Sequence, residues 1–149
     1  DFHTTDNYTI HNSVIATNLI KKFAITGEAA YNVNIAGGDF KFGNYFQGDL
    51  SMGLLILPKE YSSYDDVNLN VYSETKAYYF EKNKFLGDEI SNSGGFRLDT
   101  YLGVQAIFLS SLMAELSYMI PLHSNEYVET QVEKRSGSLL LSLRYLFFL

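Results

Sequence analysis

The sequence predicts an all-β protein, and more specifically an antiparallel up-and-down transmembrane β-barrel. Apolar and polar residues alternate along most of the 149-residue chain, which is typical of strands with two different faces. Most alternating stretches are about 11–15 residues long, against about five or six for an ordinary strand and about 9–11 for a membrane-crossing strand. The connections between them alternate between short and long, as they do in outer-membrane barrels.

Seven stretches are expected to form strands. In chain order they are residues 10–20, 23–35, 46–57, 67–81, 96–108, 112–122 and 138–147, and the alternation is weakest in the first. In the third, Phe46 and Leu50 share one face while Asp49 and Ser51 share the other. Residues 108–122 also fit helical spacing, with a serine available as an N-cap. A strand is expected there because its neighbours are strands and one helix would leave sheet edges unpaired.

The connections indicate an orientation. Residues 20–22 and 109–111 are short connections, 58–66 is intermediate, and 36–44, 82–95 and 123–135 are long and polar. Outer-membrane barrels have short periplasmic turns and longer extracellular loops. Placing the C-terminus at the periplasmic end puts all three long connections outside the cell. The expected location is therefore the outer membrane of a Gram-negative bacterium.

Aromatic residues are expected to form two girdles around the barrel. The chain has 12 Tyr and 11 Phe but no Trp. On the apolar faces, Phe23, Phe108, Tyr145 and Phe147 lie at the periplasmic end, and Tyr31, Phe46, Tyr79, Phe96 and Tyr118 lie toward the outer end. The band between them is mostly aliphatic. Aromatic rings gather where a barrel meets the lipid headgroups, so outer-membrane lipid is an expected partner.

The polar faces carry seven charged residues that are expected to point into the barrel. They are Glu28, Asp49, Glu74, Lys76, Asp99, Glu115 and Arg144. One interpretation is a lining that gives a pore or substrate path its selectivity. The alternative is a network of paired charges that fills a narrow barrel.

The composition argues against several other classes of protein. The chain has no Cys, so it has neither disulfides nor thiolate metal ligands, and its net charge of -6 disfavours a nucleic-acid partner. Its three histidines show no metal-ligand spacing, and no Ser/His/Asp or Cys/His arrangement is indicated. We therefore expect no metal, no cofactor and no enzymatic activity. A soluble sandwich or lipocalin-like binding barrel also alternates, but its apolar face points inward.

The C-terminal third resembles a known family. Residues 96–149 contain "LDTYLGVQAIFLSSLMAELSYMIPLH" and, after a polar loop, "LLLSLRYLFFL". They resemble the end of transporter-type outer-membrane barrels, most closely the family named for the meta-pathway of phenol degradation and its Bacteroidetes relatives. Tyr101, Leu102, Gln105, Ile120 and Pro121 match the outline of that family's last hairpin, with Gly103 shifted. The resemblance implies a β-barrel that passes small, often hydrophobic, molecules.

The final strand resembles the signal that the barrel-assembly machinery reads, which makes that machinery an expected partner during biogenesis. Tyr145 and Phe147 have the aromatic spacing of this signal, although Leu149 stands where Phe is usual. Alternation turns Arg144 toward the interior, which avoids the roughly 2–4 kcal/mol that an arginine costs when it faces lipid at mid-depth. Glu115 on the adjacent strand is its expected partner.

Seven strands are an odd count, whereas bacterial single-chain barrels have an even one. We therefore expect the chain, one domain over residues 1–149, to lack N-terminal strands and to be the C-terminal portion of a larger barrel. A short extra strand in residues 1–9, or several chains sharing one barrel, would also resolve the count. The expected function is a pore or transport path for small molecules. The alternatives are a structural or interaction subunit, in contact with other outer-membrane subunits, and a soluble lipocalin-like binding barrel.

Overall fold

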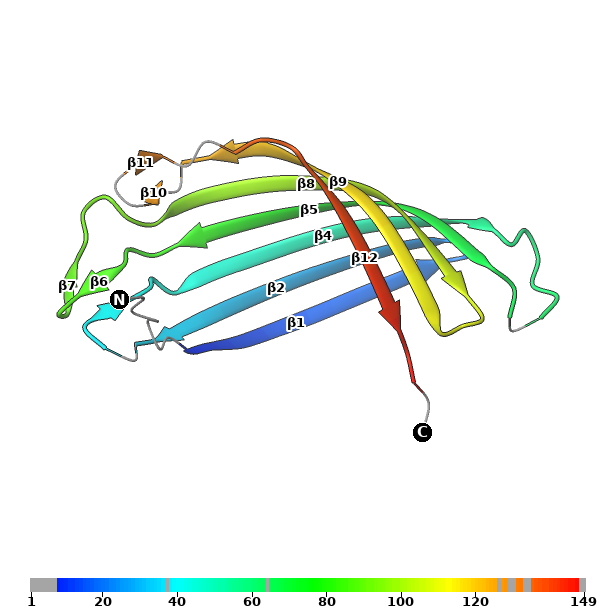
Figure 1. Ribbon diagram of the computed structural model, residues 1–149, viewed down its shortest axis with the longest axis horizontal. Coiled ribbons are helices and arrows are strands. Elements are labelled where there is room, and N and C mark those ends of the chain that lie inside the picture. Colours follow the sequence, from blue (N-terminus) through cyan, green and yellow to red (C-terminus); the bar gives the residue numbers. More distant parts are fainter. Residues whose placement is uncertain are drawn as a thin grey trace.

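A computed structural model of the chain describes residues 8–36, 38–63, 65–125, 127–128, 131–132 and 135–147. Seven long strands form one antiparallel sheet in the order β1-β2-β4-β5-β8-β9-β12 (Figure 1). They are β1 (Tyr8–Ile20), β2 (Phe23–Ile35), β4 (Tyr45–Leu57), β5 (Asn68–Phe80), β8 (Gly95–Phe108), β9 (Leu112–Ser124) and β12 (Ser138–Tyr145). All seven predicted strands are confirmed. The helical alternative for residues 108–122 is wrong, because β8 ends there and β9 begins.

The connections between the long strands lie in two groups, one at each end of the sheet. The long ones lie together at one end, here called the loop end (Figure 1). There, β3 (Phe40–Lys41), β6 (Lys84–Phe85) and β7 (Asp88–Glu89) form a small sheet, and β10 (Tyr127–Val128) pairs with β11 (Gln131–Val132). At the opposite end, here called the turn end, lie the short turns 21–22 and 109–111 and the ten-residue connection 58–67. The two short turns lie at the end that the alternating connection lengths predicted, together with the intermediate connection.

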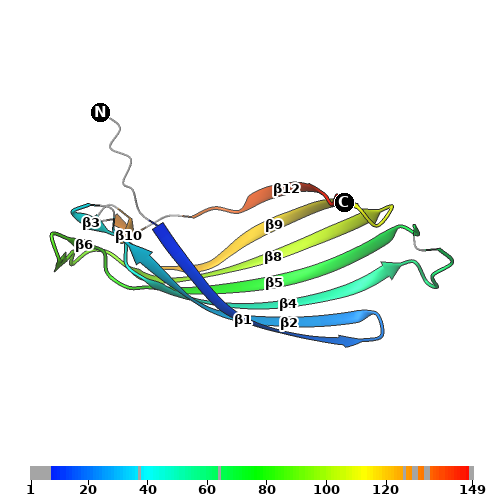
Figure 2. The same ribbon diagram turned by 90° about the horizontal axis from the view of Figure 1, so that it is seen from below.

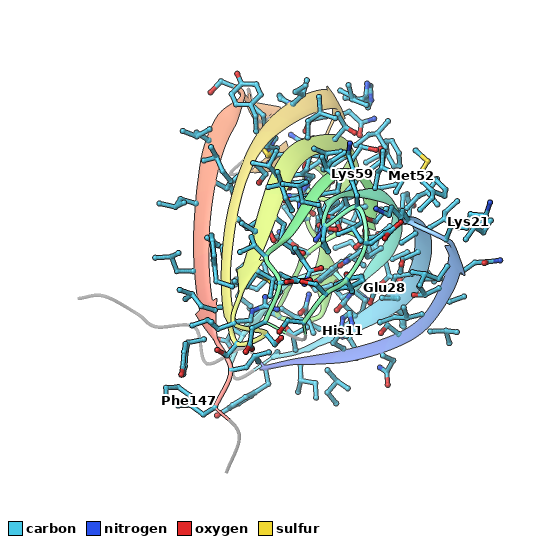
Figure 3. All side chains as sticks on the ribbon, turned by 90° about the vertical axis from the view of Figure 1, so that its right-hand side faces the viewer. His11, Lys21, Glu28, Met52, Lys59 and Phe147 are labelled. Carbon is cyan, nitrogen blue, oxygen red and sulfur yellow. The ribbon has the colours of Figure 1, made fainter. Side chains whose placement is uncertain are left out.

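The sheet is strongly curved, and its two faces differ in chemistry. Glu28 and His11 lie inside the curve, whereas Met52 lies outside it (Figure 3). We call these the inner and the outer face. The buried polar residues are Asn32, Asn34, Asp99 and Ser117, all at inner-face positions. Leucines at outer positions, such as Leu139 and Leu141, are more than 70% exposed. This polarity is the reverse of a soluble barrel, whose apolar residues point inward.

The sheet is open, and the seven strands do not close into a barrel by themselves. Among the described residues, β1 pairs only with β2 and β12 only with β9, so each is an edge strand of this sheet (Figure 2). Because seven strands alternate in direction, β1 and β12 run parallel to each other. Within the described residues, no helix is long and apolar enough to cross a membrane.

Candidate functional site

The inner face of the sheet is the candidate site. The structure places all seven charged residues predicted to face inward on this face, because each lies at an inner position of its strand. Period-two alternation sets the face of every side chain once one of them is fixed. Six of these side chains take part in hydrogen bonds or ion pairs, and Arg144 makes none among the described residues.

Four of the charged residues form a row across the middle of the sheet. Glu28 on β2 is directly opposite Asp49 on β4, Asp49 is opposite Lys76 on β5, and Lys76 is opposite Asp99 on β8. Residues directly opposite each other in an antiparallel pair have Cβ atoms about 5 Å apart. We call this set the charged row. Its order of signs places two carboxylates side by side at the β2 end.

Side chains from neighbouring strands contact the β2 end of the charged row. His11 Nε2 lies 3.3 Å from a Glu28 carboxylate oxygen, and His11 Nδ1 is 2.7 Å from Asn32 Oδ1. Lys76 Nζ lies 3.8 Å from Asp49 and 3.2 Å from Glu74. These contacts reduce the repulsion between adjacent like charges, which would otherwise destabilise the pair.

Arginines cover the β8 end of the charged row. Asp99 is fully buried, and Arg135, from the residues that precede β12, donates to both of its carboxylate oxygens. Arg97 Nε lies 3.4 Å from the same carboxylate. The Arg97 guanidinium also lies over two aromatic rings, 4.1 Å from the Tyr78 centroid and 5.1 Å from the Phe80 centroid. A buried carboxylate requires such partners, because an unpaired charge costs several kcal/mol to bury.

A second cluster lies nearer the turn end, beside an open pocket of about 720 Å³. The Tyr72 hydroxyl donates to Glu115 Oε1 at 2.6 Å, and Gln105 Nε2 donates to Glu115 Oε2 at 3.3 Å. Asn70 Nδ2 donates to Gln105 Oε1 at 3.4 Å. Leu19, Leu55 and Ile107 give the pocket an apolar side. A solute there would meet amide, carboxylate and aliphatic groups together.

Gly103 permits the contact between Tyr72 and Glu115. Tyr72 is on β5 and Glu115 on β9, so the tyrosine side chain must cross β8 between them. It crosses at Gly103, where an added Cβ would lie only 2.5 Å from Tyr72 Cζ. A residue with any side chain at this position would displace the ring.

The connection between β4 and β5 folds against the turn end. Lys22 Nζ donates to the carbonyl oxygens of Pro58 and Lys59 at 2.7 and 2.6 Å. Asp66 Oδ2 accepts from the backbone amides of Ser62 and Ser63 at 2.6 and 3.0 Å. Hydrogen bonds from these two amides favour the ionised carboxylate and lower the pKa of Asp66 below its ordinary value.

Arg144 faces inward, but its expected ion pair with Glu115 is wrong. Arg144 is directly opposite Met113, and Ser142 is opposite Glu115. The Glu115 carboxylate instead binds Tyr72 and Gln105. Arg144 is exposed at the edge of the sheet because β12 has no neighbour on its other side within the part of the chain that the structure describes.

Eight of the nine predicted interfacial aromatics lie at outer-face positions of the sheet. They are Phe23, Tyr31, Phe46, Tyr79, Phe96, Phe108, Tyr118 and Tyr145. Phe147 lies beyond the end of β12, is 80% exposed, and contacts the Tyr145 ring at a centroid distance of 4.6 Å. Tyr31 packs on Phe46 at 4.5 Å and donates to Glu81 at 3.2 Å, so it joins an apolar neighbour to a polar loop.

Sequence reasoning missed several residues of the inner face. Arg97 has a usable signal, because it is two residues from Asp99 and must share its face. The same rule places Tyr72 and Tyr78 on the same face of the strand as Glu74 and Lys76. Arg135 has no such signal, because it lies outside the alternating stretches and reaches the inner face only through the path of a connection.

No group of three or more His, Cys, Asp or Glu side chains within the described part of the chain could hold a metal ion. No protein-family model, curated protein or solved structure matches this chain.

Proposed function

We propose that the chain forms part of the wall of a β-barrel in the outer membrane of a Gram-negative bacterium, and that its inner face lines a path for small molecules. The observation that carries this proposal is the reversed polarity of the sheet. Charged and hydrogen-bonded side chains occupy the inner face, while large apolar side chains cover the outer face and remain exposed.

The extent of the outer face supports a lipid environment. Soluble monomers rarely expose a continuous apolar patch larger than a few hundred Å². Here exposed leucine, isoleucine, valine and aromatic side chains occur on all seven long strands. Strands of 13 or 14 residues, as in six of the seven, are long enough to cross a hydrocarbon core at a tilt.

The open edges support a larger barrel, of which these seven strands would be one part. Lipid cannot satisfy the free N–H and C=O groups of an edge strand, so a membrane sheet must close. Direct pairing of β1 with β12 would be parallel, because the two strands run in the same direction. An odd number of other strands between them would keep every pair antiparallel and make the total even.

The connections support an orientation with the loop end outside the cell and the turn end in the periplasm. Barrels of this class carry their longer loops outside. The aromatic pair Tyr145 and Phe147 then lies at the periplasmic end, where the barrel-assembly machinery would recognise the last strand.

A matched pair of tryptophans on β12 tests the lipid contact. Leu141 is on the outer face and Leu140 on the inner face, and the chain has no tryptophan of its own. In vesicles that contain brominated lipid, we expect the fluorescence of Leu141→Trp to be strongly quenched and that of Leu140→Trp to be largely retained. Equal quenching of the two variants would refute the two-faced membrane wall.

Conductance in planar lipid bilayers tests the path itself. Discrete, stable conductance steps are expected from the purified protein with its complete barrel, of which these seven strands are the proposed part. The second candidate function is a structural or interaction subunit, and the hydrogen-bonded network of the inner face favours it, since such a network can fill a narrow barrel. Lipid quenching without any conductance, together with co-purifying subunits, would support that second candidate over the pore.

A further inference from the structure

We propose that Arg135 is a determinant of the charge selectivity of the path and shifts it toward anions. This inference rests on the proposed function and concerns the charged row, which is the part of the inner face with the highest density of charge. Arg135 does not belong to a strand of the seven-stranded sheet. It reaches the row from the residues that connect β11 to β12.

The charged row without arginines would favour cations. It contains the carboxylates of Glu28, Asp49 and Asp99 but only the ammonium group of Lys76. Glu74, 3.2 Å from Lys76, adds a further carboxylate beside it. Cations concentrate near such a surface and anions are repelled from it.

Arg135 and Arg97 change this balance at the β8 end of the charged row. Both contact the carboxylate of Asp99 and bring positive charge to this end of the row. Arg97 is fixed on β8 by its contacts with Tyr78 and Phe80. Arg135 also contacts the sulfur of Met119 at 3.4 Å, and its side chain is 16% exposed, so it keeps some access to solvent on the inner face.

The field of Arg135 extends far enough to act on a passing ion. Screening at physiological salt has a length of about 8 Å, which is comparable to the dimensions of a solute path. With this screening, a unit charge about 6 Å from the ions changes the local concentration of cations by about 1.7-fold and that of anions by the same factor in the opposite direction. A change of one charge at this position should therefore shift the cation-to-anion permeability ratio by about threefold.

Three variants test the sign of this effect. We expect Arg135→Gln to shift the permeability ratio for potassium over chloride about threefold toward potassium, because Asp99 keeps its charge. Asp99→Asn should shift the ratio in the opposite direction by a similar factor. The double variant Arg135→Gln/Asp99→Asn removes one charge of each sign and should return the ratio to the wild-type value. The ratio is measured from reversal potentials in a potassium chloride gradient across planar bilayers.

Two controls isolate the position of the charge. Arg135→Lys keeps the positive charge and should leave the ratio unchanged. Lys84→Gln removes one positive charge from β6, which lies in the small sheet at the loop end, and should shift the ratio much less than Arg135→Gln. Opposite shifts in Arg135→Gln and Asp99→Asn cannot come from misfolding, which would not depend on the sign of the removed charge.

The outcomes separate this inference from the proposed function. A conducting wild-type protein whose ratio does not respond to Arg135→Gln, or responds equally to Lys84→Gln, would overturn the role of Arg135 and leave the pore in place. Shifts of the two single variants in the same direction would also overturn it. A wild-type protein without conductance would overturn both the pore and the inference that rests on it.

Discussion

The crossing of Tyr72 over Gly103 gives a quantitative prediction for Gly103→Ala. The new methyl carbon would lie 2.5 Å from Tyr72 Cζ and 2.6 Å from its hydroxyl oxygen, whereas ordinary contacts begin at 3.4 Å. The ring must therefore withdraw by about 1 Å. A hydrogen bond of 2.6 Å to Glu115 does not survive such a displacement.

The change in the free energy of unfolding is the difference between a lost hydrogen bond and a gain in backbone entropy. A hydrogen bond to a charged acceptor contributes about 1.5–3 kcal/mol, and Gln105 is then the remaining partner of Glu115. Replacing glycine by alanine in a strand returns about 0.5–1 kcal/mol through the restricted backbone of the unfolded chain. Gly103→Ala should thus lower the free energy of unfolding by about 1–2 kcal/mol.

A double-mutant cycle with Tyr72→Ala isolates the crossing. In the Tyr72→Ala background there is neither a ring to displace nor a bond to lose. Gly103→Ala should then be neutral, or stabilising by about 0.5–1 kcal/mol. The free energies are measured by denaturant titration of the folded protein in lipid or detergent. If Gly103→Ala costs the same in both backgrounds, the interpretation of Gly103 as the crossing point is refuted.

Three further predictions concern the outer face, a turn and a loop. Leu50→Arg on the outer face should make folding into lipid vesicles less favourable by about 2–4 kcal/mol, whereas the neighbouring inner-face variant Ser51→Arg should destabilise the protein much less. Lys21 has a φ of 56° in the turn between β1 and β2, so Lys21→Asn should raise the free energy of unfolding by about 0.5–1 kcal/mol in the same titration. The pKa of Asp66 is lowered from 3.8 in the folded loop, so its stabilisation of the loop is present above about pH 4 and is lost as the pH falls through the folded value. Hydrogen exchange at the amides of residues 62–63 should accelerate on acidification, and Asp66→Asn should remove this dependence.

Most strand positions could be predicted from the sequence, because period-two alternation depends on local chemistry. Residues 23–35 were predicted as a strand and form β2 with the same bounds. The bounds of β9 and β12 differ from those predicted. β9 continues past Pro121 because the register shifts there by one residue, so the strand tolerates a proline. β12 ends at Tyr145 because its last partner is Leu112, the first residue of β9.

The face of each charged residue followed from alternation, but its partner did not. The partner depends on strand order, on register and on crossings such as that of Tyr72 over β8. Glu115 illustrates this, because the expected partner was Arg144 on the adjacent strand, whereas the observed donor, Tyr72, is two strands away. Arg135 could not be placed at all, since no periodic pattern specifies where a connection folds.

The alternation of the strands also determines when the chain becomes hydrophobic. Along the unfolded chain, the apolar residues in the first half of a strand such as β4 are separated by Gln47, Asp49 and Ser51. The strand therefore contains no long, continuous apolar segment. A continuous apolar surface arises only after neighbouring strands have paired and turned their side chains to one side. In the proposed membrane location, affinity for lipid would therefore be a property of the assembled sheet, and an unpaired chain would stay dispersed in water until pairing begins.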